Sequence, residues 1–193
     1  MNVVFRLDAS KNIGMGHLSR CRNLAFFLDK KGAKIDFVLR NLDRGFKNFL
    51  NHKKYKLNYL PNNRIFNKTL NSDSEKLWPR LLQKIDAKET KKFLSKKKIE
   101  WLIVDHYGLN YRWEKDLNNN VKNIMVIDDH LNREHFCNLF LNQNFTKSST
   151  SFSNKYLPKK CKLLLGPKYS LLDKNYIDLK KKIKIKNNKK IKN

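Results

Sequence analysis

The chain has 193 residues, of which 40% are hydrophobic, and a formal net charge of +26. This length suits one globular domain with a substantial core, and no apolar run approaches the roughly 18 residues that would span a membrane. The start lacks the charged and long apolar stretches of a secretion signal, and the three cysteines are too far apart for a disulfide framework or a zinc pattern. We therefore expect a soluble protein of the reducing cytoplasm.

The positive charge allows two interpretations. Lys and Arg number 43 against 17 Asp and Glu, and such a field attracts polyanions such as nucleic acid. Most of the basic residues are lysines spread along the chain together with many asparagines, so a general compositional bias explains them as well. No nucleic-acid-binding motif supports the first interpretation. Residues 180–193 form a dense Lys/Asn run without an apolar face, so we expect this run to be disordered or loosely helical, in a tail that covers residues 177–193.

Apolar runs alternate with amphipathic segments along the chain, which predicts alternating strands and helices. The expected strands cover residues 3–5, 35–39, 57–60, 101–104, 124–127, 139–141 and 163–165. The expected helices cover residues 16–31, with Gly32 as the cap, 43–51, and 73–97 with a break near Pro79. Strands separated by helices are typical of βαβ units. The sequence therefore predicts an α/β fold, with a Rossmann-like parallel sheet flanked by helices in residues 1–176.

Polar residues follow four of the expected strands, at the point where each strand ends. Arg6 and Asp8 follow the first, and residues 105–108 (DHYG), 128–130 (DDH) and 142–144 (NQN) follow three later ones. In parallel sheets, ligands bind beyond the carboxyl ends of the strands. Turns are polar in any protein, but four such clusters together predict one shared site. Asp128, Asp129, His130 and His135 are residue types that can bind a metal, but spacing of this kind is common in sequences. We expect no metal there.

The stretch NIGMGH at residues 12–17 joins the first strand to the first helix. Gly14 and Gly16 allow a sharp turn and a close approach of backbone to a ligand. The N-terminus of the helix favours anions and disfavours an imidazolium ion, so His17 should be neutral and able to accept a proton from water. Taken alone, this histidine is equally consistent with a helix cap or a core residue.

Four ordered motifs resemble the PseG family of UDP-sugar hydrolases. They are FRLDASKNIGMGHLSRCRNLAFFLDKKG (5–32), LIVDHYGL (102–109), VIDDH (126–130) and LLGPKYSLL (164–172). The family is similar to MurG-type glycosyltransferases and has the GT-B fold, in which two Rossmann-like domains enclose a cleft. The resemblance implies that residues 1–176 correspond to the N-terminal GT-B domain. It also implies that the second domain, which carries most nucleotide contacts in the family, is absent here.

The resemblance further implies an activity in pseudaminic acid biosynthesis. The expected reaction is hydrolysis of UDP-2,4-diacetamido-2,4,6-trideoxy-β-L-altropyranose to UDP and the free sugar, without a metal or a cofactor. His17 matches the catalytic histidine of the family and would be the general base. The residues expected to bind the substrate are Asp8, Gly14, Gly16, Asp105, His106, Tyr107 and Asp129.

Three hypotheses remain at this point. The chain is a hydrolase that needs a second chain for its missing domain or is inactive alone, or it is half of a GT-B-like glycosyltransferase, or it binds polyanions through its charge. The products formed from a UDP-sugar separate the first two. Salt-dependent binding to any duplex that survives His17→Ala would identify the third.

Overall fold

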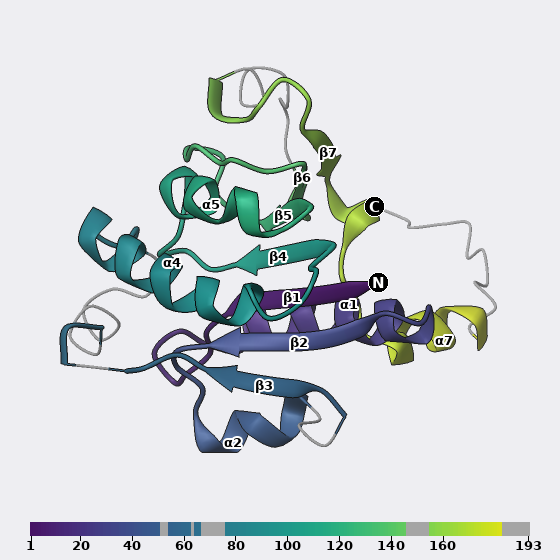
Figure 1. Ribbon diagram of the computed structural model, residues 1–193. Coiled ribbons are helices and arrows are strands. Elements are labelled where there is room, and N and C mark those ends of the chain that lie inside the picture. The colour runs from purple at the N-terminus through teal and green to yellow at the C-terminus, as the bar shows by residue number, and fades with distance from the viewer. Residues whose placement is uncertain (51–53, 63, 67–75, 146–154, 183–193) are drawn as a thin grey trace.

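The computed structural model describes residues 1–50, 54–62, 64–66, 76–145 and 155–182. Its centre is a seven-stranded sheet in which every neighbouring pair is parallel, in the order β3-β2-β1-β4-β5-β6-β7 (Figure 1). The strands are β1 (Asn2–Leu7), β2 (Lys34–Leu39), β3 (Lys56–Tyr59), β4 (Trp101–Asp105), β5 (Asn123–Ile127), β6 (Leu139–Asn142) and β7 (Lys162–Leu165). All seven expected strands are present, which confirms the predicted Rossmann-like α/β class.

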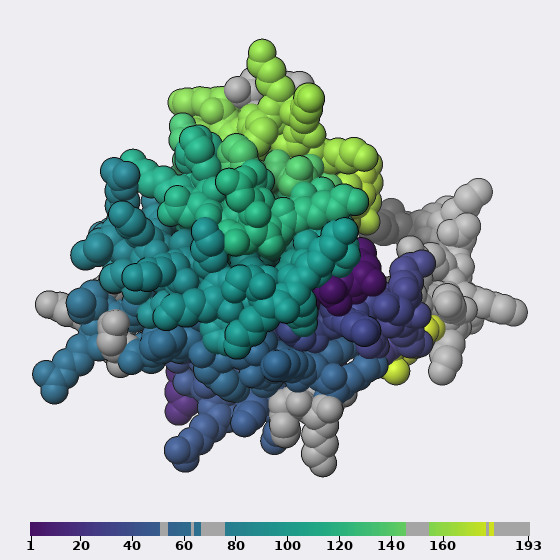
Figure 2. Space-filling model, viewed as in Figure 1, coloured from purple at the N-terminus to yellow at the C-terminus, as the bar shows by residue number. Residues whose placement is uncertain are grey.

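Helices cover both faces of the sheet. They are α1 (Gly16–Lys30), α2 (Arg44–Lys47), α4 (Arg80–Leu94), α5 (Tyr111–Leu117) and α7 (Lys174–Lys182), with 3₁₀ turns η1 (Asn48–Leu50), η2 (Asn118–Asn120) and η3 (Pro167–Tyr169). Figure 1 shows α4 and α5 in front of the sheet and α1 behind it. In the space-filling view, teal residues of the α4–α5 region form much of the near face (Figure 2).

The core has two layers because the side chains of each strand alternate between the faces of the sheet. Val4, Val38 and Leu102 pack on the α4–α5 side, together with Trp113 of α5. On the other side, α1 packs against residues of β1 and β2 through buried residues that recur at helical spacing, namely Leu18, Cys21 and Ala25. The spacing of apolar residues in the sequence therefore locates α1 and determines which of its sides is buried.

Two of the helices differ from the expected ones. Helix α4 begins directly after Pro79, because proline suits the entrance of a helix and not its interior. Helix α5 has only seven residues and was not predicted. Helix α1 ends where expected, and Gly32 adopts a positive φ of 83° and donates its N–H to the Asp29 carbonyl at 2.8 Å.

Helix α7 includes the first residues of the expected tail, so residues 177–182 are helical. Asp173 explains the helical start, since its side chain accepts the Asn175 N–H at 2.9 Å. Asp173 also pairs with Arg22 of α1 at 3.1 Å. The remaining tail, residues 183–193, lies outside the described residues. Within the described part of the chain, no helix is long and apolar enough to cross a membrane.

Candidate functional site

The site lies where the order of the strands reverses. β2 and then β3 lie on one side of β1 in the sheet. The chain then crosses over, and β4 pairs with the other side of β1. Such a switch point leaves an opening beyond the carboxyl ends of the two central strands, where ligands bind in open parallel sheets. Asp8 follows β1 and Asp105 ends β4, so both residues come to this position.

His17 faces the DHYG segment. It lies in the first turn of α1, and its Nδ1 contacts Oδ1 of Asp105. Its ring meets the ring of Tyr107 edge-on, with centroids 4.5 Å apart. The residue that caps α1 is Met15, and the partners of the imidazole are polar. The helix-cap interpretation of His17 therefore does not fit the structure, and the imidazole is a buried ring with polar partners.

The second ring nitrogen of His17 remains available. His17 is only 4% exposed, but its Nε2 makes no hydrogen bond to any described residue. Among described residues, the buried side-chain polar atoms without a partner are Asn120 Oδ1 and Asn142 Nδ2. Nδ1 contacts Asp105 and lies 3.3 Å from Arg20 Nη2, so Nε2 is the ring nitrogen that has no hydrogen-bond partner among the described residues.

Arg20 is the central residue that the sequence analysis missed. Its Nε donates to Oδ2 of Asp105 at 2.5 Å and its Nη2 donates to Oδ1 at 2.7 Å, which makes a two-pronged ion pair. Burial by itself would raise the pKa of Asp105, but His17 and Arg20 hold it well below its usual range. Asp105 is therefore ionised. The signal for Arg20 was its position three residues after His17, on the same side of the helix.

Asp129 links the strand ends on the β5 side. Its Oδ2 accepts hydrogen bonds from Arg20 Nη1 at 2.5 Å and from the Tyr107 hydroxyl at 2.7 Å. Its Oδ1 accepts one from Asn144 Nδ2 at 3.3 Å. Burial and the neighbouring Asp129 raise the pKa of Tyr107, so this hydroxyl keeps its proton. The polar clusters after β4, β5 and β6 thus join one network around His17, whereas the cluster after β1 does not take part in it.

Asp8 and His106 form a second, deeper group. Asp8 is fully buried, and its carboxylate accepts hydrogen bonds from Arg6, from the backbone N–H groups of Arg40 and Asn41, and from His106 Nε2 at 3.1 Å. Burial lowers the pKa of His106, although Asp8 opposes this shift. Among the described residues, no hydrogen bond or ion pair joins this pair to His17. The hydrogen bond between Asp8 and His106 therefore holds the segment that carries Tyr107 against the protein interior.

The three glycines of the two motifs have different roles. Gly14 has a φ of +84° and donates its N–H to the Ser10 carbonyl at 2.7 Å, so it forms the sharp turn. Gly16 has no positive φ, and a Cβ there would meet no atom within 4 Å. The turn therefore needs Gly14 and not Gly16, but the space beside Gly16 is open. At Gly108, which was not predicted, a Cβ would lie 2.6 Å from the Trp78 ring.

Two of the residues considered for a metal, Asp128 and His135, form an ion pair with each other. His135 lies between Glu114 at 2.7 Å and Asp128 at 3.1 Å. Burial alone would lower the pKa of His135, but the two carboxylates raise it to about 10. In the part of the chain that the structure describes, no three His, Cys, Asp or Glu side chains are grouped to hold a metal ion.

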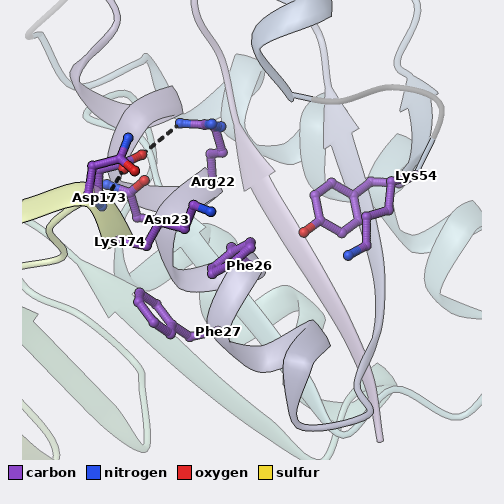
Figure 3. A pocket seen from close by; sticks show the side chains of 9 residues that line it. Arg22, Asn23, Phe26, Phe27, Lys54, Asp173 and Lys174 are labelled. Carbon is purple, nitrogen blue, oxygen red and sulfur yellow. Dashed lines mark hydrogen bonds and ion pairs between the residues drawn. The ribbon is translucent and has the colours of Figure 1, made fainter. Parts of the chain in front are cut away.

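A separate hollow of about 210 Å³ lies on the outer side of α1 (Figure 3). It is lined by Arg22, Asn23, Phe26, Phe27, Lys54, Tyr55, Asp173, Lys174 and Asn175. Arg22 and Asp173 close one end of it through their ion pair, and Asn23 Nδ2 donates to the Leu171 carbonyl at 2.9 Å. These contacts hold the segment before α7 against α1, and none of the predicted site residues lines this hollow.

Comparison with known proteins gives one curated sequence relative. No family model matches the chain. The UDP-2,4-diacetamido-2,4,6-trideoxy-β-L-altropyranose hydrolase of Campylobacter jejuni is 27% identical over 178 residues, which cover 91% of this chain and 53% of the relative. This chain therefore spans about half the length of the curated relative that it matches.

Comparison of the fold gives similar solved structures. Acinetobacter baumannii MurG aligns with a TM-score of 0.52 and 9% identity over 77% of this chain and 43% of that protein. A UGT transferase from Siraitia grosvenorii in complex with UDP aligns with a TM-score of 0.43 and 12% identity, over 66% of this chain and 27% of that one. The resemblance predicted from the motifs is confirmed: the chain is similar in sequence to a UDP-sugar hydrolase, and its Rossmann-like sheet is that of a GT-B-like domain.

Proposed function

We propose that this chain carries the water-activating site of a UDP-sugar hydrolase, with UDP-2,4-diacetamido-2,4,6-trideoxy-β-L-altropyranose as the substrate. The observation that supports this most is the contact of His17 Nδ1 with the ionised Asp105, which leaves Nε2 as the reactive atom. The sequence similarity to the Campylobacter jejuni hydrolase supplies the reaction and the substrate.

In the proposed reaction, His17 acts as the general base. Nε2 accepts a proton from a water molecule as the water oxygen bonds to the anomeric carbon of the sugar. The bond from that carbon to the diphosphate oxygen breaks, and its electron pair leaves with UDP. Asp105 fixes Nδ1 as the protonated nitrogen and stabilises the imidazolium ion that forms, while Arg20 holds Asp105 in place.

The surroundings of His17 offer groups for the rest of the substrate. Tyr107 and Asp129 are partly exposed, and we assign them to hydroxyl or acetamido groups of the sugar. No side chain caps the first turn of α1, so its free N–H groups suit a diphosphate oxygen. The open space beside Gly16 would let the substrate reach this turn. Because the relative is about twice as long as the matched region, we propose that a further domain or chain completes the UDP site.

The test measures UDP and free sugar released from this UDP-sugar. The full chain is assayed alone and after addition of the half of the Campylobacter jejuni relative that it does not match. We expect release in at least one arm, and we expect His17→Gln to lower kcat by a factor of about 100 or more. His130→Gln is the matched control, because this ring also lies near Tyr107, at 4.8 Å, but does not contact Asp105.

Two results would contradict the proposal. One is release by His17→Gln at the rate of the unsubstituted chain, and the other is no release in either arm by protein with an intact circular dichroism spectrum. Sugar found on an acceptor, and not free in water, would identify a glycosyltransferase instead.

A further inference from the structure

Two cysteines lie side by side at the amino ends of neighbouring strands. Cys137 comes shortly before β6 and Cys161 immediately before β7, and their sulfur atoms are 3.5 Å apart. The sheet fixes this arrangement through a hydrogen bond between the residues that follow the two cysteines. Lys162, which follows Cys161, donates its N–H to the carbonyl of Asn138, which follows Cys137, at 2.9 Å. Both thiols are free. A disulfide bond of about 2.05 Å would bring the two sulfur atoms roughly 1.5 Å closer together.

The two thiols differ in exposure and in acidity. Cys137 is 5% exposed, whereas Cys161 is half-buried. The hydrogen bond from the Cys137 thiol lowers the pKa of Cys161, and the nearby positive charge of His135 acts in the same direction. The same hydrogen bond, together with burial, raises the pKa of Cys137. A thiolate at a partly exposed position is the form that oxidants attack.

We propose that Cys137 and Cys161 form an oxidation site that a hydroperoxide converts into a reversible intramolecular disulfide. The Cys161 thiolate attacks one peroxide oxygen, the O–O bond breaks, and hydroxide leaves, so Cys161 becomes a sulfenic acid. Cys137 then attacks the Cys161 sulfur, the S–O bond breaks, and water leaves as the S–S bond forms. The two thiols lose two electrons, and the peroxide gains them. A dithiol reductant reverses the modification.

This site is separate from the candidate hydrolase site. His17 and Asp105 lie near the carboxyl ends of β1 and β4. The two cysteines lie at the amino ends of β6 and β7, which is the opposite end of the parallel strands. The inference therefore does not depend on the proposed function. Cys21 is an internal control, because it is fully buried, burial raises its pKa, and its thiol lies 3.5 Å from Asp105 Oδ2 and not beside another thiol.

The experiment treats the folded full chain with hydrogen peroxide, then blocks the remaining thiols under denaturing conditions and measures the intact mass. We expect the three thiols of the chain to fall to one, with the loss of two hydrogen atoms. A tryptic digest should contain one peptide pair joined through Cys137 and Cys161, and dithiothreitol should restore all three thiols. Cys137→Ser should stop at the sulfenic or sulfinic acid on Cys161, and Cys161→Ser should lower the rate of oxidation about tenfold or more.

The same treatment in urea shows whether the fold directs the pairing. Unfolded chain should give mixed pairs that include Cys21, at a lower rate. The proposal is overturned if folded chain keeps three thiols at peroxide concentrations that oxidise free cysteine, or if Cys21 pairs as often as Cys137 does. Disulfides between chains only, or equal pairing in folded and unfolded protein, would also overturn it.

Discussion

The carboxylate of Asp105 connects the end of β4 to the first turns of α1. It is fully buried, contacts Nδ1 of His17, and accepts two hydrogen bonds from Arg20. A buried carboxylate is tolerated only when cations or N–H groups compensate its charge. The orientation of the reactive histidine therefore depends on an arginine one turn further along the same helix.

Replacing Arg20 with methionine should destabilise the fold and the site together. Asp105 would lose its two hydrogen bonds from the guanidinium group, and the loss of one member of a buried ion pair costs about 3–5 kcal/mol. Urea denaturation measures this change in the free energy of unfolding. Arg22→Met is the matched control, since Arg22 forms a partly exposed pair with Asp173 and should cost about 0–1 kcal/mol. Equal effects of the two substitutions would show that Arg20 does not compensate Asp105.

Gly108 should not tolerate even one added carbon atom. A Cβ there would lie 2.6 Å from the Trp78 ring, which is itself 3% exposed and cannot move outward freely. We expect Gly108→Ala to lower the free energy of unfolding by about 1–3 kcal/mol. Gly16→Ala is the comparison, because its Cβ enters open space at the start of a helix and should be neutral or slightly stabilising. A smaller loss for Gly108→Ala than for Gly16→Ala, both followed by thermal denaturation, would contradict this account of the packing.

At the scale of elements, a buried ion triad fastens α5 to the sheet. Glu114 of α5 contacts His135 and accepts the Phe136 N–H, and Asp128, just after β5, contacts the other nitrogen of His135. Asp129, the next residue, holds Tyr107 and Arg20. The short helix α5 therefore stabilises the loop on which the partners of the candidate site depend.

The charge of His135 makes stability depend on pH above neutrality. Its pKa in the folded chain is about 10, against an ordinary value of 6.5. Between these values the folded state binds the proton and the unfolded state does not, so the free energy of unfolding falls as pH rises. The contribution is full below about pH 6.5 and decreases by up to about 1.4 kcal/mol per pH unit toward pH 10.

Urea denaturation between pH 7 and pH 9 measures this slope. His135→Gln removes the titrating group, so its stability should be lower at pH 7 and should change less with pH. Parallel slopes for the two proteins would contradict the assignment, because the other titrating groups are common to both.

At the scale of the whole molecule, a net charge of +26 acts against the compact state. Like charges on the surface repel one another, and salt screens them over the Debye length, which shortens from about 30 Å at 0.01 M to about 10 Å at 0.1 M. We expect the melting temperature to rise over this range of sodium chloride. A fall would mean that exposed ion pairs such as Lys97–Asp36, and not repulsion, dominate the surface.

The sequence was sufficient for the sheet, because buried parallel strands are continuous apolar runs such as residues 101–104 of β4. It also placed His17 beside the DHYG segment, since the topology of a parallel sheet brings strand ends together. It did not reveal the close contact of Gly108 with Trp78, which are 30 residues apart in the chain. Nor did the sequence show that Asp8 is buried and surrounded by hydrogen-bond donors, whereas Asp129 is partly exposed. Both distinctions depend on long-range packing, which residue type and spacing do not encode locally.

Because β1 lies between β2 and β4 in the sheet, its two edges are paired at different times during synthesis of the chain. β1 can pair with β2 soon after both leave the ribosome, but its other neighbour is β4, about 60 residues later. At translation rates of about 5–20 residues per second, one edge of β1 waits roughly 3–12 s for its partner. During that interval an apolar strand edge is open to other nascent chains and to chaperones. His17 is made early but acquires Asp105 only when this edge closes, so a stalled or shortened product that ends before residue 105 carries the histidine without the carboxylate that orients it.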